Sequence, residues 1–268
     1  MTNTCIIIPA RMNSSRFPGK PLVAIAGIPM IAHCIARAVL TVGSKNVFVA
    51  TCDLEIAQYA NGQGVMAIMT SSEHERATTR VAEAFDTLIK RGFAYRFVIM
   101  LQGDEPNILP ESVASVISEL AVPGAEIANG MIPISHQSQV DDVNNVKVLF
   151  DVNSFALYFS RAVIPYGFSF SRAVQASKVQ IQTGLIGFTN SSLEKFNELE
   201  ESFYEQSESV DMNRWIENGG AIRMISMNQS GVGVDTPDDV ALAEKLLKVD
   251  KTIAFYPKNL LELVTINK

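Results

Sequence analysis

Short, continuously apolar runs alternate with helix-like segments over the first 120 residues, and this rhythm constrains the fold more than any other feature. Strands that are apolar along their whole length are typical of a parallel sheet covered by helices on both faces. The predicted strands are residues 4–8, 46–51, 65–69 and 97–101. The predicted helices, which have helical periodicity or a helix-starting proline, are residues 30–42, 54–61, 78–91 and 110–120.

The rhythm changes after residue 126. Strand-like pieces dominate up to residue 188, which indicates an antiparallel addition to the sheet. Helices are predicted again at 191–199, 207–218 and 236–247, with a last strand at 221–227. The tail from residue 250 carries no motif. We therefore predict one α/β domain over residues 1–268, with an antiparallel subdomain at about 126–188.

Bulk composition narrows the class of protein. No apolar run reaches the roughly 18 to 20 residues of a membrane helix, and the first residues do not resemble a secretory signal. The net charge of −6 argues against a long nucleic-acid-binding surface. Three cysteines and three histidines are widely scattered, so we predict neither a disulfide framework nor a zinc site. We expect a cytoplasmic protein that binds neither membranes nor nucleic acid.

Cations gather in the N-terminal segment. The first carboxylate of the chain is Asp53, and five cations precede it. Three of these, Arg11, Arg16 and Lys20, lie within a ten-residue stretch of a single loop, which is rich in proline, serine and glycine. Because this loop follows the first strand, it lies at the carboxyl edge of the sheet, where α/β proteins bind ligands. The pattern indicates a phosphate site, with a basic surface loop as the alternative; neither GxxxxGK[ST] nor GxGxxG is present.

Carboxylates follow two further strands. Asp104 and Glu105 come just after the run 97–101, where Gly103 allows a tight turn, and Asp235 comes after the last predicted strand. A magnesium ion shared with phosphates needs one or two carboxylates plus water molecules. The sequence therefore predicts a magnesium site at the same edge as the phosphate loop. The alternative is that these carboxylates only cap helices or face solvent.

Three motifs carry a resemblance to a known family: IIIPARMNSSRFPGKPL, LQGDEP and GVDTPDDV. They resemble motifs of the CMP-Kdo synthetases, or 3-deoxy-manno-octulosonate cytidylyltransferases, whose N-terminal signature is PAR-x-x-S-[ST]-R-[LF]-P-x-K-P-L. The resemblance implies a Rossmann-like nucleotide-diphospho-sugar transferase fold and a homodimer formed through the antiparallel subdomain. It also implies CMP transfer from CTP to the anomeric hydroxyl of a 3-deoxy-2-keto sugar acid (Kdo or a modified Kdo-like acid), which releases pyrophosphate and supplies precursors of lipopolysaccharide or surface polysaccharide.

The same resemblance assigns site residues. It implies that Arg11, Arg16 and Lys20 bind the CTP triphosphate, with Lys20 at the α-phosphate. It implies that Asp104 and Asp235 bind Mg²⁺, that Gln102 faces the sugar acid, and that Lys20, Arg11 and Asp104 are the catalytic residues. The further nucleotide-binding residues that it implies are Pro9, Ala10, Ser15 and Arg80.

The motifs near the base and the sugar depart from the family pattern. Where the family has H-x-S-G-T-[DE]-R, residues 74–80 read HERATTR, which keeps His74 and Arg80. This stretch lies near the cytosine in the family, so Arg80 is expected to read the base; the alternative is a charge on a helix face. Where the family has K-H-x-G-x-Y, this chain has Gln182 at the histidine position and Ile186 at the tyrosine position.

Two more positions bear on the sugar acid. In the family motif E-x-L-E-Q-L-R the second glutamate is shortened to Asp211, which makes room for about one methylene. Arg161 matches the family's YFSR segment and is either a carboxylate clamp or half of a structural ion pair. We expect Gln102, Arg161, Gln182 and Asp211 to bind the acceptor. Because the triphosphate and metal motifs are intact, we predict the same nucleotidyl transfer to an altered acceptor.

Two other functions stay open on the sequence. The changed segment 74–80 is compatible with a nucleotidyltransferase that uses another base or a non-sugar acceptor. The changed sugar-facing residues are compatible with a non-catalytic, nucleotide-binding homologue.

Overall fold

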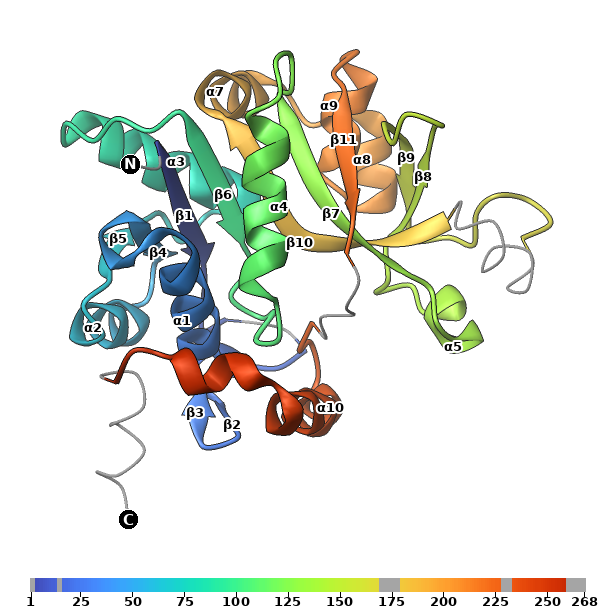
Figure 1. Cartoon of the computed structure of the whole chain (residues 1–268). Helices are drawn as coiled ribbons and strands as arrows, with labels where there is room; N and C mark the ends of the chain where they lie inside the picture. Colours follow the sequence, from blue (N-terminus) through green and yellow to red (C-terminus); the bar gives the residue numbers. More distant parts are fainter. Residues whose placement is uncertain (1–2, 14–15, 169–178, 228–232, 259–268) are drawn as a thin grey trace. The chain divides into compact units, whose positions relative to one another are not determined.

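A computed structural model of the chain describes residues 3–13, 16–168, 179–227 and 233–258. The chain divides into two compact units (Figure 1). The first consists of Met1–Ala114 and Gly231–Lys268, and the second of Ser115–Ser230. The second unit is therefore an insertion into the first. The chain enters it within helix α4 (Pro110–Leu120).

The first unit is built on four parallel strands. β1 (Thr4–Pro9) pairs with β6 (Phe97–Leu101) on one side and with β4 (Val47–Thr51) on the other. β5 (Met66–Met69) extends the sheet from β4. Every residue of β1, β4 and β6 is buried, which explains why these segments are apolar without interruption.

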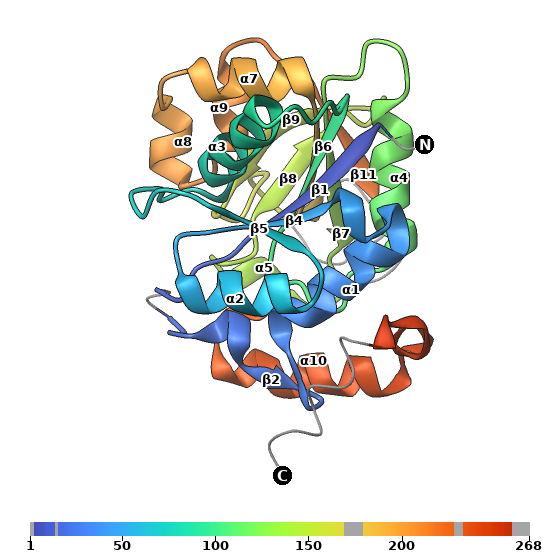
Figure 2. The same ribbon diagram turned by 90° about the vertical axis from the view of Figure 1, so that its left-hand side faces the viewer.

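Helices cover both faces of this sheet. α1 (Met30–Val42) and α3 (Ala77–Lys90) both pack on β1 and β4, and they approach from opposite faces (Figure 2). α2 (Leu54–Gly62) packs on β4 and β5. The opposite faces follow from right-handed crossovers, because α1 leads outward from β1 to β4 whereas α3 returns from β5 to β6.

The C-terminal segment belongs to the first unit. α10 (Pro237–Val249) packs on a small hairpin of β2 (Ala24–Ile25) and β3 (Ile28–Pro29), as Figure 1 shows. The two-residue turn of that hairpin has a positive φ at both positions, as a tight primed turn requires. The remaining elements of this unit are the short helices η1 (Lys20–Leu22), η2 (Ser44–Asn46) and η3 (Lys251–Phe255).

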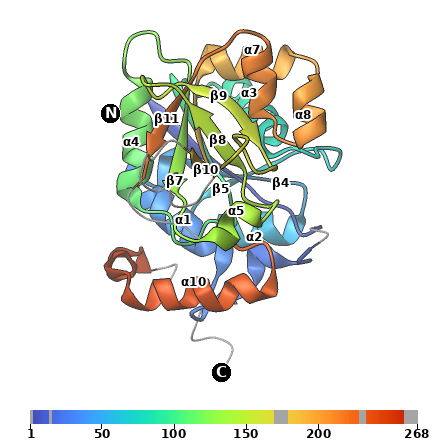
Figure 3. The ribbon, with the colours of Figure 1, turned by 90° about the vertical axis from the view of Figure 1, so that its right-hand side faces the viewer.

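The second unit is mainly antiparallel (Figure 3). Its strand order is β11–β7–β10–β8–β9; β11 is parallel to β7, and the other three pairings are antiparallel. The register between β10 and β7 shifts between Gln182 and Ile186, which marks a bulge. The strands are β7 (Ile127–Pro133), β8 (Lys147–Phe150), β9 (Ala156–Ser160), β10 (Val179–Thr189) and β11 (Ile222–Ser226).

Aromatic side chains fill the core of the second unit. Phe196 lies 6.3 Å from Trp215 in a stacked arrangement and 6.0 Å from Phe188 in an edge-on one, measured between ring centroids. The helices here are α5 (Gln137–Asp141), α7 (Asn190–Glu198), α8 (Phe203–Glu208) and α9 (Met212–Glu217).

Most predicted elements lie within one or two residues of the observed ones, and those at 30–42 and 97–101 coincide with α1 and β6. The predicted helix 207–218 is wrong. Ser209 adopts a left-handed conformation with φ of 53° and ends α8, so two shorter helices form instead. Among the described residues, none of the helices has the length and apolar character needed to cross a bilayer.

Candidate active site

The loop after β1 is closed and anchored at its base. The Gly19 N–H donates a hydrogen bond to the Met12 carbonyl at 2.9 Å, and the Met12 N–H donates to the Asp53 carboxylate at 2.8 Å. Gly19 has a φ of 75°, a left-handed conformation that most side chains disfavour. These contacts therefore fix the ends of the loop that carries Arg16 and leads to Lys20.

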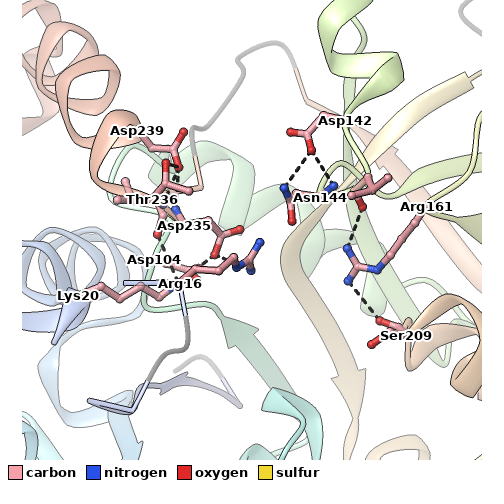
Figure 4. Close-up of polar contacts among 12 residues, drawn as sticks. Arg16, Lys20, Asp104, Asp142, Asn144, Arg161, Ser209, Asp235, Thr236 and Asp239 are labelled. Atoms are coloured by element: carbon pink, nitrogen blue, oxygen red, sulfur yellow. Dashed lines mark hydrogen bonds and ion pairs between the residues drawn. The ribbon is translucent and has the colours of Figure 1, made fainter. Parts of the chain in front are cut away.

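Lys20 is the centre of a charged cluster (Figure 4). Its Nζ lies 2.6 Å from Asp104 Oδ2, 3.1 Å from Asp235 Oδ1 and 3.3 Å from the Val234 carbonyl oxygen. Arg16 Nη2 lies 3.0 Å from the same Asp235 oxygen. Burial disfavours the ammonium, but Asp104 and then Asp235 outweigh it and raise the pKa of Lys20 above its ordinary value. Lys20 therefore stays charged at neutral pH.

The two carboxylates reach Lys20 from separate segments that are themselves joined. The Val234 N–H donates to the Asp104 carbonyl at 2.9 Å, which links the loop after β6 to the segment before α10. Asp239 Oδ2 accepts hydrogen bonds from the Asp235 N–H and from the N–H and hydroxyl of Thr236. The alternative that Asp235 only faces solvent is therefore wrong, since its carboxylate is held by two cations and its backbone by the helix cap.

Gly103 has a more specific role than turn flexibility. A Cβ at this position would lie 3.0 Å from the Pro9 carbonyl oxygen and 3.5 Å from Ala10 Cβ. The loop that carries Asp104 therefore lies so close to the end of β1 that a side chain here would require a shift of a few tenths of an ångström.

The donor set fits a magnesium ion. Asp104 and Asp235 converge on one ammonium, so their carboxylates already point at a common positive charge. Mg²⁺ commonly takes one or two carboxylates together with phosphate oxygens and water. Within the described part of the chain, no group of three or more His, Cys, Asp or Glu side chains could hold a metal. A site of two carboxylates completed by substrate phosphates is the arrangement that these residues can offer.

Arg11 and Arg80 meet at a second place in the first unit, the loop before α3. Arg11 Nη1 donates to the His74 carbonyl at 3.2 Å, and Arg80 Nη2 lies 3.5 Å from the same oxygen. Arg80 Nη1 also donates to the Thr70 hydroxyl at 2.6 Å and to the Ser71 carbonyl at 3.2 Å. Arg80 is only 2% exposed, so the alternative of a surface charge on a helix face is wrong.

The His74 ring is fixed as well. Its Nδ1 lies 3.1 Å from the Thr79 hydroxyl, and its Nε2 pairs with the Glu83 carboxylate. Glu83 also accepts from the Ser71 N–H at 2.9 Å. Partial burial works against the charge on Glu83, but the bonds from Ser71 and His74 outweigh it and lower its pKa. Thr79, which stands at the family's acidic position, thus serves as a partner of the imidazole.

In the second unit, Gln182 belongs to an amide network whose orientation is determined. Asn129 Nδ2 donates to the carbonyls of Gly130, Thr183 and Leu185, so Asn129 Oδ1 must be its free acceptor. Gln182 Nε2 donates to that oxygen at 2.7 Å. Gln182 Oε1 is left as an acceptor, and it receives no hydrogen bond from any other described residue.

Arg161 is engaged by backbone carbonyls. Its Nε donates to Glu208, its Nη1 to Val143 and its Nη2 to Ser209, at 2.9, 3.0 and 3.3 Å (Figure 4). The Glu208 carboxylate in turn accepts from the Arg161 N–H at 2.9 Å and from the Ser160 hydroxyl at 2.8 Å. Three backbone carbonyls therefore hold the guanidinium of Arg161 in position.

Comparison with known proteins identifies the family to which the chain belongs. The family model described as Cytidylyltransferase matches residues 5–225. An 8-amino-3,8-dideoxy-manno-octulosonate cytidylyltransferase of Shewanella baltica is 38% identical over 257 residues, which cover 92% of this chain and 100% of that protein. A 3-deoxy-manno-octulosonate cytidylyltransferase of Thermodesulfovibrio yellowstonii is 37% identical over 254 residues, covering 91% and 98%. This chain belongs to the cytidylyltransferase family.

A solved structure agrees with this assignment. CMP:2-keto-3-deoxy-manno-octonic acid synthetase, complexed with CTP, matches with a TM-score of 0.80 at 34% identity and covers 91% of this chain and 98% of that one. The expected fold class, the resemblance to the CMP-Kdo synthetases and the prediction of a CTP-dependent nucleotidyltransferase are therefore confirmed.

The structure of the cytidylyltransferase brings together four predicted site residues, as we expected from their positions after predicted strands: Arg16, Lys20, Asp104 and Asp235. Arg11 contacts the loop before α3 instead, together with Arg80. The other predicted residues are placed as follows: Pro9 and Ala10 are buried at the end of β1, Gln102 follows β6, Asp211 precedes α9, and Ser15 lies outside the described residues.

Asp53 was missed as a site residue. It accepts a hydrogen bond from the Met12 N–H and so anchors the loop after β1 of the cytidylyltransferase. A signal was present, because Asp53 is the first carboxylate of the chain and follows β4 at the edge where the loop after β1 also lies.

Proposed function

We propose that this cytidylyltransferase transfers CMP from CTP to the anomeric hydroxyl of a 3-deoxy-manno-octulosonate, either Kdo or its 8-amino-3,8-dideoxy form, and releases pyrophosphate. The activities of the relatives from Thermodesulfovibrio yellowstonii and Shewanella baltica support these two acceptors. The observation that carries the proposal is the placement of the Lys20 ammonium between the carboxylates of Asp104 and Asp235, with Arg16 beside it.

The chemistry is an in-line displacement at the α-phosphorus of CTP. The sugar hydroxyl oxygen forms a bond to that phosphorus, the bond to the bridging oxygen of pyrophosphate breaks, and the hydroxyl proton passes to solvent. Lys20 neutralises charge that develops on the α-phosphate, and Arg16 binds the leaving phosphates. Magnesium, held by Asp104 and Asp235 when bound, supplies divalent charge to the phosphate oxygens.

For the rest of the nucleotide, we assign Pro9, Ala10, Arg11, Ser15 and Arg80 to CTP binding. Arg11 and Arg80 both hold the His74 carbonyl, which supports a role for the segment 70–74 in contacting the base. Because Arg80 donates to backbone and hydroxyl oxygens of this segment, it would act on the base by setting the shape of the segment.

On the acceptor side, we assign Gln102, Arg161, Gln182 and Asp211 to the sugar acid. The clearest support concerns Gln182, whose Nε2 is occupied by Asn129 and whose Oε1 is left to accept. A hydroxyl or an ammonium group of the sugar could donate to it. Because a hydrogen bond from an ammonium is charge-assisted and stronger, Gln182 favours the 8-amino acid over Kdo.

The test is pyrophosphate release with CTP, magnesium and either acid, followed at equal enzyme concentration. We expect turnover with at least one acid and a larger kcat/KM for the 8-amino form. Gln182→Leu should reduce that preference without affecting the KM for CTP. Absence of turnover with both acids would contradict the proposed acceptor class, and a preference for UTP or GTP over CTP would contradict the proposed donor.

The proposed oligomeric state rests on the family resemblance alone. We propose a cytoplasmic homodimer, formed through the antiparallel region 126–188, whose activated sugar enters lipopolysaccharide or surface-polysaccharide synthesis.

A further inference from the structure

Arg37 is a buried cation that the proposed chemistry does not use. Its side chain is completely buried in α1. Nη1 donates to the Ile108 carbonyl at 2.7 Å, and Nη2 pairs with the Asp250 carboxylate. Ile108 ends a turn that begins at Glu105, the residue after Asp104, and Asp250 caps the end of α10. One guanidinium thus joins the metal-site loop to the start of the C-terminal tail.

His33 makes a second link one turn earlier in α1. It is completely buried, with Nε2 at 2.9 Å from the Ile25 carbonyl oxygen and Nδ1 at 3.2 Å from the Tyr256 hydroxyl. A carbonyl can only accept, so Nε2 carries the proton and Nδ1 accepts from Tyr256. Ile25 belongs to the hairpin that follows Lys20. The tail is therefore hydrogen-bonded, through His33, to the segment leaving the phosphate loop.

An apolar cluster connects the same parts of the first unit. Val234, next to Asp235, is fully buried in a core with Ile25, Met30, Ala243 and Leu247. Phe17, which lies in the phosphate loop between Arg16 and Lys20, packs against this core. Ile253 of η3 packs against it too. The tail thus supports both segments that carry the charged cluster.

We propose that residues 250–256 form a C-terminal clamp in which Asp250 and Tyr256 are positioning residues for Lys20, Asp104 and Asp235. Asp250 acts through Arg37 on the loop of Asp104, and Tyr256 acts through His33 on the hairpin after Lys20. The inference rests on the proposed function, because it concerns the geometry of the same phosphate and metal site. It assigns a role to a segment that lies beyond the family match at 5–225 and carries no motif.

The clamp has a kinetic signature that a purely structural cluster lacks. The clamp holds the segments that carry Lys20, Asp104 and Asp235, whereas three of the four proposed acceptor residues, Arg161, Gln182 and Asp211, belong to the second unit. The fourth, Gln102, lies two residues before Asp104. Loss of the clamp should therefore weaken CTP binding and lower kcat, with a smaller change in the KM for the acceptor. General loss of stability would reduce the amount of active enzyme without separating the two substrates.

The experiment compares Asp250→Asn and Tyr256→Phe with wild type, and uses Lys251→Ala as the control. Asp250→Asn removes the charge opposite Arg37 but keeps an oxygen that can cap Thr252, and Tyr256→Phe removes one hydroxyl. Lys251 is exposed within the same segment. The measurements are the Kd for CTP by calorimetry and the KM for each substrate, at a temperature where every variant is folded.

We expect Asp250→Asn to raise the Kd for CTP and lower kcat/KM by about tenfold, because small displacements of positioned groups have effects of this order. Tyr256→Phe should have a smaller effect in the same direction, and Lys251→Ala none. Unchanged CTP parameters, in folded variants with a lowered Tm, would overturn the clamp. CTP binding that responds to the variants while no sugar acid reacts would support the clamp and contradict the proposed acceptor. Failure of the wild type to bind CTP would overturn both.

Discussion

At the scale of single residues, Lys20 is the group on which two acidic segments and the phosphate loop converge. Its ammonium contacts Asp104 and Asp235 in a largely buried position. Lys20→Ala removes a fixed cation where charge develops in the transition state, so we expect kcat/KM to fall by roughly 10²- to 10³-fold. Steady-state pyrophosphate release measures this. The control is Lys45→Ala, an exposed lysine of the same cation-rich segment, which should keep the wild-type rate.

A Lys20→Ala enzyme within tenfold of wild type would remove Lys20 from the catalytic residues. Circular dichroism of the variant should stay native, because Asp104 and Asp235 are also held by backbone contacts of their own segments.

His33 makes a residue-scale prediction about pH. Burial, together with the nearby Arg37, lowers the pKa of His33 to about 4, although the Ile25 carbonyl and Asp250 oppose the shift. Between that value and the ordinary 6.5, the unfolded chain binds a proton that the folded chain does not. Stability should therefore fall as the pH falls through this window, by at most about 1.4 kcal/mol per pH unit from this group.

Urea unfolding at pH 7, 6 and 5 measures the effect against His33→Gln, which cannot titrate there. We expect the free energy of unfolding of wild type to fall more steeply with acid than that of the variant. Parallel curves would mean that His33 titrates normally. The other groups facing it, Arg37, Asp250 and Tyr256, are present in both proteins and so cancel in the comparison.

At the scale of elements, the loop after β6 depends on its close approach to β1. A Cβ on Gly103 would lie 3.0 Å from the Pro9 carbonyl oxygen, which is a backbone atom of β1. Gly103→Ala should therefore displace Asp104 and lower kcat/KM by about tenfold, with a smaller effect on Tm. The matched control is Gly62→Ala near the end of α2, where a Cβ meets nothing within 4 Å. Equal rates for the two variants would show that the approach has no catalytic importance.

The elements also show what local sequence can and cannot predict. The strands of the first unit were predictable because a sheet covered on both faces requires unbroken apolar runs, and α1 was predictable from its periodicity. The division of 207–218 into α8 and α9 was not, because Ser209 has no sequence feature that demands a left-handed backbone. The short helix η3 was missed for a different reason, because it is held by contacts with residues far away in the sequence.

The candidate site also has parts that the sequence can predict and parts that it cannot. Asp104 and Lys20 were predictable because each lies after a strand of the parallel sheet in the first unit, and all three residues, Asp235 included, lie in family motifs. The Arg37–Asp250 pair was not predictable, since its members are 213 positions apart and neither lies in a motif. Arg37 was counted only as one of the N-terminal cations, yet it is fully buried against a carboxylate.

At the scale of the whole molecule, the family resemblance predicts a homodimer. Sedimentation equilibrium should give a mass twice that of the 29.3 kDa chain at micromolar concentration. Two apolar side chains in the expected antiparallel region are exposed, Leu157 of β9 and Val152 before it. Leu157 is therefore a suitable position for a variant that tests the interface. Leu157→Lys should shift the mass toward the monomer if this part of the region forms the interface. A monomeric wild type would contradict the predicted assembly.

The insertion of the second unit into the first has a consequence for how the protein is made. A chain leaves the ribosome from its N-terminus, and compact units fold as they emerge. Ser115–Ser230 is continuous, so it can complete its sheet during synthesis. The first unit must wait for residues 233–258, which bring Asp235, α10 and the clamp. A nascent chain halted before that point would already contain the acceptor-side residues but could not assemble the pair of carboxylates. If both carboxylates are required, as we propose, competence to consume CTP is acquired only after residues 233–258 have been translated.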